Sequence, residues 1–140
     1  VSDHKKRRPA DWITAEVPRH LSDVLPQLFI KADVILIDCL TVYVATLLYD
    51  YRECLPRDIE DRAGEEMREI LRLLRQSGKS VILVTNEVGS GIVPPDAVSR
   101  LFRDVAGRVN RLAAAEADEV YLSVSGLAVE IKSRAVTKGE

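Results

Sequence analysis

Apolar and polar residues follow one another along the chain in blocks that predict strands and helices in turn. The β-branched apolar run at 33–41 predicts a strand covered on both faces, as in a parallel sheet. A second apolar run, at 81–88, ends in a polar tip and also predicts a strand. Two more strands are predicted at 119–125 and 127–132. The link at Gly126 is so short that this last pair must be antiparallel.

Between these runs, apolar residues recur at helical spacing and predict helices at 19–30, 42–51, 57–76 and 95–115. Pro26 interrupts the first of them, so a short or kinked helix is expected there. The stripe of the helix at 57–76 consists of Ile59, Ala63, Met67, Ile70, Leu71 and Leu74. Strands that alternate with helices predict one three-layer α/β domain over residues 1–140, with a mostly parallel sheet and an antiparallel strand at its C-terminal end.

Composition narrows the function classes. The net charge of -2 gives the chain no overall attraction to nucleic acid or to an anionic membrane. Cys39 and Cys54 form neither a disulfide framework nor a zinc pattern, so we expect reduced thiols in a cytoplasmic protein. No apolar run approaches the roughly 18 residues that a membrane span needs.

One local cluster of charge stands out near the N-terminus, where His4 is followed by Lys5, Lys6, Arg7 and Arg8. A neutral imidazole can attack a phosphorus atom and form a labile phosphoramidate. Adjacent cations would neutralise the charge that accumulates on the phosphate oxygens. A solvated basic tail near a chain terminus produces the same pattern. The pattern by itself leaves both interpretations open.

Asp38 ends the predicted strand at 33–41 and is followed by Thr41. A carboxylate in this position resembles the residue that holds Mg²⁺ in nucleotide-binding proteins. The alternative is an Asp that caps the next helix or closes the sheet end. The chain also contains no GxxxxGK[ST] phosphate loop, and its Gly-Lys-Ser at 78–80 precedes a predicted strand rather than a helix.

A third candidate lies after the strand at 81–88, where Asn86 and Glu87 precede a glycine-rich turn. Polar residues at a strand end before a flexible loop are typical of a ligand site in an open α/β sheet. A plain polar turn explains the same residues. Further along, an exposed salt-bridged helix face would account for Arg100, Arg103, Asp104 and Arg108.

Taken together, three stretches resemble one family. They are HKKRRPADW at 4–12, DCLT at 38–41, and TNEVGSGIVPPDAVSRLFRDVAGRVNRLAAAEADEVYLSVSG at 85–126. They resemble the bifunctional adenosylcobinamide kinase / adenosylcobinamide-phosphate guanylyltransferase of cobalamin biosynthesis. The resemblance extends from about His4 to Lys132.

The resemblance implies a RecA-like P-loop fold and two reactions. The first phosphorylates adenosylcobinamide with ATP or GTP, and the second transfers GMP from GTP to adenosylcobinamide phosphate. It implies that His4 carries the GMP, that Mg²⁺ is the cofactor, and that Asp38 lies at the Mg²⁺ position. The nucleotide contacts that it implies are Lys5, Lys6, Arg7, Arg8, Glu16 and Asp38, with Asn86 and Glu87 as loop contacts.

The family begins with a strand, a phosphate loop and a second strand before the histidine, whereas this chain starts just upstream of the histidine. We therefore expect a fragment, a mis-started product or a protein that has lost these first strands, with weak affinity for GTP. Unpaired backbone and apolar surface would then favour a homo-oligomer. A non-catalytic remnant that serves as a binding or structural module is the alternative function. Nucleic-acid binding through the basic residues at 5–8 ranks last, because Trp12 is the only aromatic side chain near them on which a base could stack.

Overall fold

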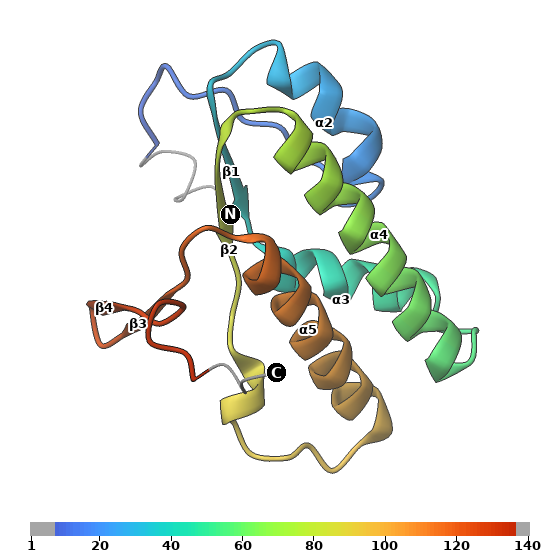
Figure 1. The fold of residues 1–140 in the computed structure, drawn as a ribbon. Coiled ribbons are helices and arrows are strands. Elements are labelled where there is room, and N and C mark those ends of the chain that lie inside the picture. The colour runs from blue at the N-terminus through green and yellow to red at the C-terminus, as the bar shows by residue number, and fades with distance from the viewer. Residues whose placement is uncertain (1–7, 137–140) are drawn as a thin grey trace.

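The computed structural model describes residues 8–136 of the chain (Figure 1). Its helices, in order, are α2 (Leu21–Phe29), α3 (Leu40–Asp50), α4 (Pro56–Gln76), the short 3₁₀ helix η1 (Val88–Ser90) and α5 (Ala97–Glu116). Its strands are β1 (Val34–Asp38), β2 (Ser80–Val84), β3 (Tyr121–Val124) and β4 (Leu127–Glu130). Each predicted strand and helix is therefore present within this part of the chain, with boundaries that differ by a few residues.

β1 and β2 pair in parallel, in a register that runs from Val34 opposite Ser80 to Asp38 opposite Val84. The amino ends of the two strands are also joined by an ion pair of 2.9 Å between Lys79 Nζ and Asp33 Oδ1. Because the strands are parallel and in this register, both carboxyl ends lie at one edge of the sheet. This edge carries Asp38 and the residues that follow Val84.

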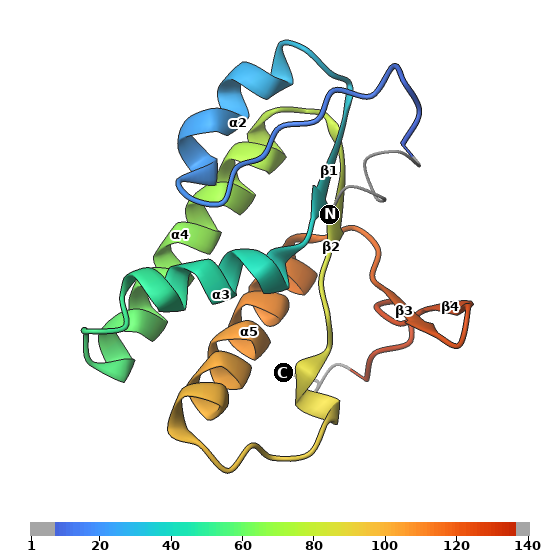
Figure 2. The ribbon, with the colours of Figure 1, turned by 180° about the vertical axis from the view of Figure 1, so that it is seen from behind.

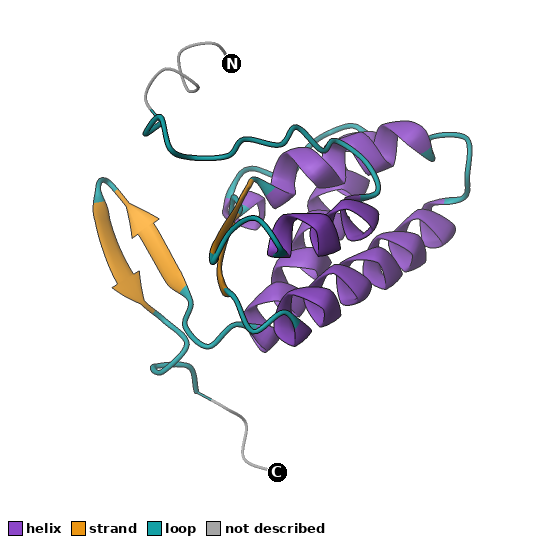
Figure 3. Ribbon diagram, turned by 90° about the horizontal axis from the view of Figure 1, so that it is seen from above, coloured by secondary structure: helices purple, strands orange, loops and turns teal. Residues whose placement is uncertain are grey.

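The helices cover one face of the β1–β2 pair, as the view from above shows (Figure 3). On the covered face Ile35 is only 7% exposed. On the other face Val34 is 57% exposed and Ile82 is 54% exposed. The expected third layer is thus not formed by residues 8–136, and the prediction that the first strand is covered on both faces is wrong for this part of the chain. The α/β class with a parallel pair and an antiparallel C-terminal pair is confirmed.

The core lies between the helices. All six residues of the predicted stripe on α4 are buried, which confirms the helical spacing. They pack with Leu25 of α2, Leu40 of α3 and Val105 of α5, each of which is fully buried. Burying one such side chain contributes about 1.5–3 kcal/mol. No helix within residues 8–136 has a stretch long and apolar enough to cross a membrane.

α5 begins two residues later than the spacing predicts, because Asp96 is its N-cap. The Asp96 Oδ1 atom accepts a hydrogen bond of 2.7 Å from the backbone N–H of Ser99. This bond, helped by the Ser99 hydroxyl, lowers the pKa of Asp96. An ionised N-cap satisfies a free N–H of the first turn and leaves Pro95 outside the helix.

β3 and β4 form an antiparallel hairpin, as predicted, but the hairpin is a separate two-stranded sheet and does not extend the β1–β2 pair. Ser125 and Gly126 connect the strands with φ angles of 53° and 80°, the left-handed pair that a two-residue hairpin turn requires. Leu122 lies opposite Val129, and two residues further on Val124 lies opposite Leu127. These four side chains share one face of the hairpin, which we call the hairpin apolar face. They are 43–73% exposed.

Candidate functional site

The carboxyl edge of the β1–β2 pair brings together the residues that the sequence placed at two strand ends. Asp38, which is exposed, is the last residue of β1 and lies opposite Val84. Asn86 and Glu87 follow β2 by two and three residues, so they lie at the same edge. The structure therefore places Asp38, Asn86 and Glu87 around one end of the sheet, where open α/β proteins bind ligands.

Two threonine hydroxyls tie this edge together. The backbone N–H of Asn86 donates to Thr41 Oγ1 at 2.8 Å. Thr41 Oγ1 also lies 3.3 Å from Thr85 Oγ1, at hydrogen-bonding distance. Thr41 belongs to the first turn of α3, which begins directly after β1. These bonds fix the start of the loop after β2 against the start of the helix after β1.

Asn110 of α5 holds the same loop from the other side. Its Oδ1 atom accepts a hydrogen bond of 2.7 Å from the Thr85 hydroxyl, and its Nδ2 atom donates to the backbone carbonyl of Asn86 at 3.1 Å. The pattern of residues in the sequence did not point to Asn110 as a site residue. Its only signal is that it is the single asparagine in α5, and an amide in a helix does not reveal which way it faces.

Glu87 stabilises the loop itself. Its Oε1 atom accepts a hydrogen bond of 2.9 Å from the backbone N–H of Gly89 and so caps η1. η1 packs against α5, and Val88 is partly buried against the core. The loop that was predicted as a ligand segment is therefore ordered by a carboxylate at its start, an amide on α5 and a short helix.

Only part of the N-terminal candidates can be placed relative to this edge. Four of them lie outside the described residues, namely His4, Lys5, Lys6 and Arg7. Arg8 donates to Thr14 Oγ1 at 3.2 Å, and Glu16 is exposed in the irregular segment before α2. Figures 1 and 2 show this segment, in dark blue, at the end of the sheet away from η1 and its loop.

Mg²⁺ has few candidate protein ligands here. Among residues 8–136, no three His, Cys, Asp or Glu side chains are grouped as a metal cluster. Mg²⁺ commonly keeps several waters and binds through one or two carboxylates together with substrate phosphates. One exposed carboxylate, Asp38, beside the hydroxyls of Thr41 and Thr85 fits that mode of binding. A dedicated cage of protein ligands does not fit the residues that the structure describes.

Arg103 of α5 is the one side chain with a buried polar atom that lacks a partner, within the part of the chain that is described. Its Nη1 atom is shielded from solvent and makes no hydrogen bond. Leaving a buried donor unsatisfied costs about 1–3 kcal/mol, and more when the group is charged. Buried polar atoms without a hydrogen bond are rare in folded proteins, so a ligand is one possible partner for this nitrogen.

Two other arginines of α5, Arg100 and Arg108, have evident structural partners. Arg100 donates to the backbone carbonyls of Pro94 and Pro95, at 3.1 and 2.6 Å. Arg108 Nη1 forms an ion pair of 2.9 Å with Glu60 Oε2 of α4. The predicted salt-bridged face is thus confirmed at Arg108, whereas Arg103 does not belong to it.

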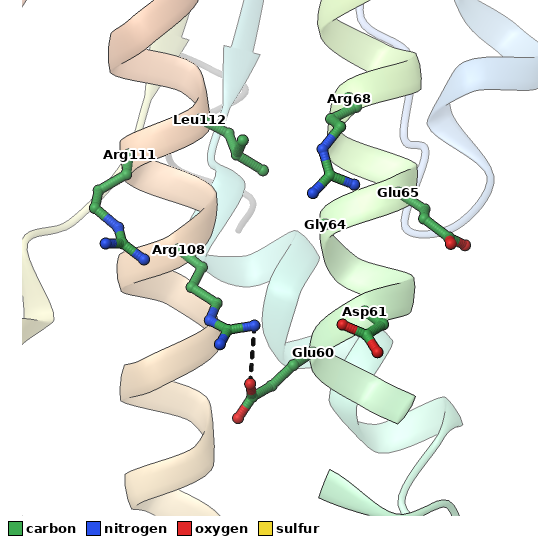
Figure 4. A pocket seen from close by; sticks show the side chains of 8 residues that line it. All are labelled: Glu60, Asp61, Gly64, Glu65, Arg68, Arg108, Arg111 and Leu112. Atoms are coloured by element: carbon green, nitrogen blue, oxygen red, sulfur yellow. Dashed lines mark ion pairs between the residues drawn. The ribbon is translucent and has the colours of Figure 1, made fainter. Parts of the chain in front are cut away.

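A groove of about 500 Å³ lies between α4 and α5 (Figure 4). The Arg108–Glu60 pair crosses it, Arg68 points into it from α4, and Arg111 of α5 is among the residues that line it. Its lining includes none of Asp38, Thr85 or Asn86, so it is separate from the carboxyl edge. Both acidic and basic side chains line it, as on an ordinary solvated helix surface.

A second polar cluster fixes α2 to α3 and α4. The backbone N–H of Leu21 donates to the Tyr43 hydroxyl at 3.2 Å, and this hydroxyl donates to the carboxylate of Glu66. Burial, followed by the bond to Glu66, raises the pKa of Tyr43. Beside it, Arg19 makes two bonds to the carboxylate of Asp50, of 2.5 and 2.7 Å. This cluster provides a hydrogen-bond acceptor for a backbone N–H group in the first turn of α2.

The described fold and edge define an α/β protein with a candidate ligand site at the carboxyl ends of parallel strands. The comparison with known families is more specific. Residues 1–131 match the family described as cobinamide kinase / cobinamide phosphate guanyltransferase. The chain belongs to this family, as the resemblance at 4–12, 38–41 and 85–126 predicted.

Three relatives support the assignment. The chain is 42% identical over 138 residues to the bifunctional adenosylcobalamin biosynthesis protein CobU of Salmonella typhimurium, which covers 94% of this chain and 76% of the relative. It is 38% identical to the protein of the same name from Escherichia coli, with the same coverage. It is 33% identical over 132 residues to the bifunctional adenosylcobalamin biosynthesis protein CobP of Pseudomonas aeruginosa, covering 94% of this chain and 72% of the relative.

Proposed function

We propose that this chain transfers GMP from GTP to adenosylcobinamide phosphate through a covalent intermediate on His4. The observation that carries the proposal is the family match over residues 1–131, which includes the histidine with its cations and the whole carboxyl edge. The 140 residues contain no GxxxxGK[ST] loop, so the proposal concerns guanylyl transfer, for which the chain has a candidate nucleophile, and not the kinase reaction.

In the first step, a neutral ring nitrogen of His4 attacks the α-phosphorus of GTP. A P–N bond forms, the bond between the α-phosphorus and its bridging oxygen breaks, and pyrophosphate leaves. Lys5, Lys6, Arg7 and Arg8 balance the charge on the phosphate oxygens. In the second step, a phosphate oxygen of adenosylcobinamide phosphate attacks the same phosphorus. The P–N bond breaks, and the neutral imidazole is restored.

At the carboxyl edge, Asp38 would hold Mg²⁺, which when bound supplies positive charge to the phosphate oxygens. Asn86 and Glu87 would contact the nucleotide from the loop, and Glu16 would contact it from the N-terminal segment. Because that segment lies at the other end of the sheet (Figure 2), the proposal requires both His4 and Glu16 to reach the carboxyl edge of their own chain or of a second copy.

Labelled GTP tests the transfer. The protein is incubated with GTP carrying ³²P at the α-phosphate and, in parallel, at the γ-phosphate. We expect label from the α-position only, lost in acid and stable in base, as for a phosphoramidate. His4→Ala should abolish the label, whereas the matched variant His20→Ala should retain it. A chain that binds GTP but takes up no label would instead support the non-catalytic alternative.

We also infer that the protein associates with further copies of itself. The outer face of β1 and β2 and the hairpin apolar face both expose large aliphatic side chains. A two-stranded hairpin is at best marginally stable alone in water, so packing against a second copy would stabilise it. A stable interface buries about 1,200–2,000 Å² in total, and the outer face of β1 and β2 would add to the area that the hairpin apolar face contributes.

A further inference from the structure

The unpartnered guanidinium of Arg103 lies on the face of α5 that is turned toward the loop after β2. Seven residues complete about two turns of an α-helix, so Arg103 and Asn110 share one face. Asn110 bonds to Thr85 and to the backbone of Asn86, which shows that this face is turned to the loop.

The position of Arg103 along the helix leads to the same place. η1 packs against α5. In Figures 1 and 2, η1 lies at the level of the amino-terminal half of α5, the half that contains Arg103. A buried cationic nitrogen without a hydrogen bond is thus located next to the loop that follows the carboxyl edge.

The described residues around this position leave the nitrogen without an acceptor. The carboxylate of Glu87, the acid of the loop, accepts from Gly89 and forms no hydrogen bond with the Arg103 Nη1 atom. Arg103 forms no ion pair or hydrogen bond with any residue from 8 to 136. An arginine with one donor nitrogen in a shielded position without an acceptor can donate to an anionic oxygen there, and planar guanidinium groups match phosphate in geometry.

We propose that Arg103 is a phosphate-binding residue, whose buried nitrogen donates to a phosphate oxygen of the nucleotide bound at the carboxyl edge. This inference rests on the proposed function, because it takes the ligand to be a nucleotide polyphosphate. Arg103 then contributes charge from α5, on the side of the loop opposite to the strand end that carries Asp38. Asn110, two turns further along, keeps the loop between them in place.

The test compares Arg103→Gln and Arg103→Lys with Arg111→Gln, a matched control on the same helix whose side chain lines the α4–α5 groove. Binding of Mg²⁺–GTP and of inorganic tripolyphosphate is measured by titration calorimetry, and thermal unfolding is recorded without ligand. We expect Arg103→Gln to weaken both ligands at least tenfold with an unchanged or raised melting temperature. Arg103→Lys should weaken them less, and Arg111→Gln should match the wild type.

Each other outcome has a distinct meaning. Equal binding by the wild type and both Arg103 variants overturns the role of Arg103 and leaves the proposed function standing. A lower melting temperature with unchanged ligand affinity shows a structural role and also overturns it. If tripolyphosphate binds in an Arg103-dependent manner while GTP does not bind, the phosphate site stands and guanylyl transfer fails. A wild type that binds neither ligand overturns both.

Discussion

Asn110 of α5 and Asn86 of the loop after β2 are joined by a hydrogen bond of 3.1 Å, from the side-chain amide of the first to the backbone carbonyl of the second. A helix far along the chain thereby fixes the residues that follow the strand end. The same amide group accepts from Thr85. The candidate ligand edge is therefore held by three elements, α3, β2 and α5.

Replacing Asn110 with Ala should loosen this loop more than it destabilises the domain. The hydrogen bonds lost are at a solvent-accessible site, so we expect a cost of about 1 kcal/mol in the free energy of unfolding. The amide of Asn86 should lose protection against hydrogen exchange well below global unfolding. Asn110→Asp separates the two bonds, since it keeps an acceptor for Thr85 and loses the donor to Asn86. Unchanged exchange at Asn86 in both variants would contradict this role.

Tyr43 should be required for stability through its hydroxyl alone. Tyr43→Phe leaves the N–H of Leu21 and the carboxylate of Glu66 without their shared partner in a buried position. We expect a loss of about 1–3 kcal/mol in urea unfolding. Tyr49→Phe is the matched control, because Tyr49 is 64% exposed. Equal stability of the two variants would show that the Tyr43 hydroxyl contributes nothing beyond its ring.

Glu130, at the base of the hairpin, should make the hairpin sensitive to acid. Hydrogen bonds from the Ser133 hydroxyl and then from the backbone N–H groups of Ser133, Val120 and Lys132 lower the pKa of Glu130 from 4.5 to about 2. A carboxylate with a lowered pKa in the folded state stabilises the fold above its unfolded pKa, and this contribution is lost as the pH falls from about 4.5 to about 2.

The measurement is a carbon NMR titration of the Glu130 carboxyl group together with amide exchange in β3 and β4. We expect a carboxyl midpoint near 2 and a loss of hairpin protection over the same pH range. The side chain in Glu130→Gln cannot ionise. In this variant the protection of the β3 and β4 amides should not change between pH 4.5 and about 2, once the intrinsic pH dependence of hydrogen exchange is subtracted. A midpoint near the ordinary value of a glutamate would contradict these hydrogen bonds as the cause of a lowered pKa.

The pattern of apolar residues predicted the elements well where a helix presents a full stripe. On α4 the apolar residues from Ile59 to Leu74 all fall on one face of the helix, so only that face could pack against the core. All six residues of this stripe are buried. It predicted the strand β1 but not its environment. A β-branched run has the same appearance whether its second face is covered or open, and the alternation of burial from Val34 to Leu36 became visible only in three dimensions.

The candidate site was predictable to the extent that strand ends define it. Asp38 and Glu87 each follow an apolar run, and parallel pairing brings such ends to one edge. Asn110 and Arg103 could not be assigned in this way, because their roles depend on which side of α5 meets the loop. The role of His4 stays a prediction, since this residue lies outside the described part of the chain.

The last prediction concerns the hairpin apolar face. If a second copy covers it, Leu122→Asp should shift the protein toward monomer in sedimentation velocity, because a charge would have to be buried opposite Val129. Ser123→Asp is the matched control, since Ser123 points to the other face of the same strand. Both positions are exposed in the single chain, so each substitution should change the free energy of unfolding of the monomer by at most about 0.5 kcal/mol. A wild type that sediments as a monomer at all concentrations would refute the self-association, because the hairpin would then be stable without a partner.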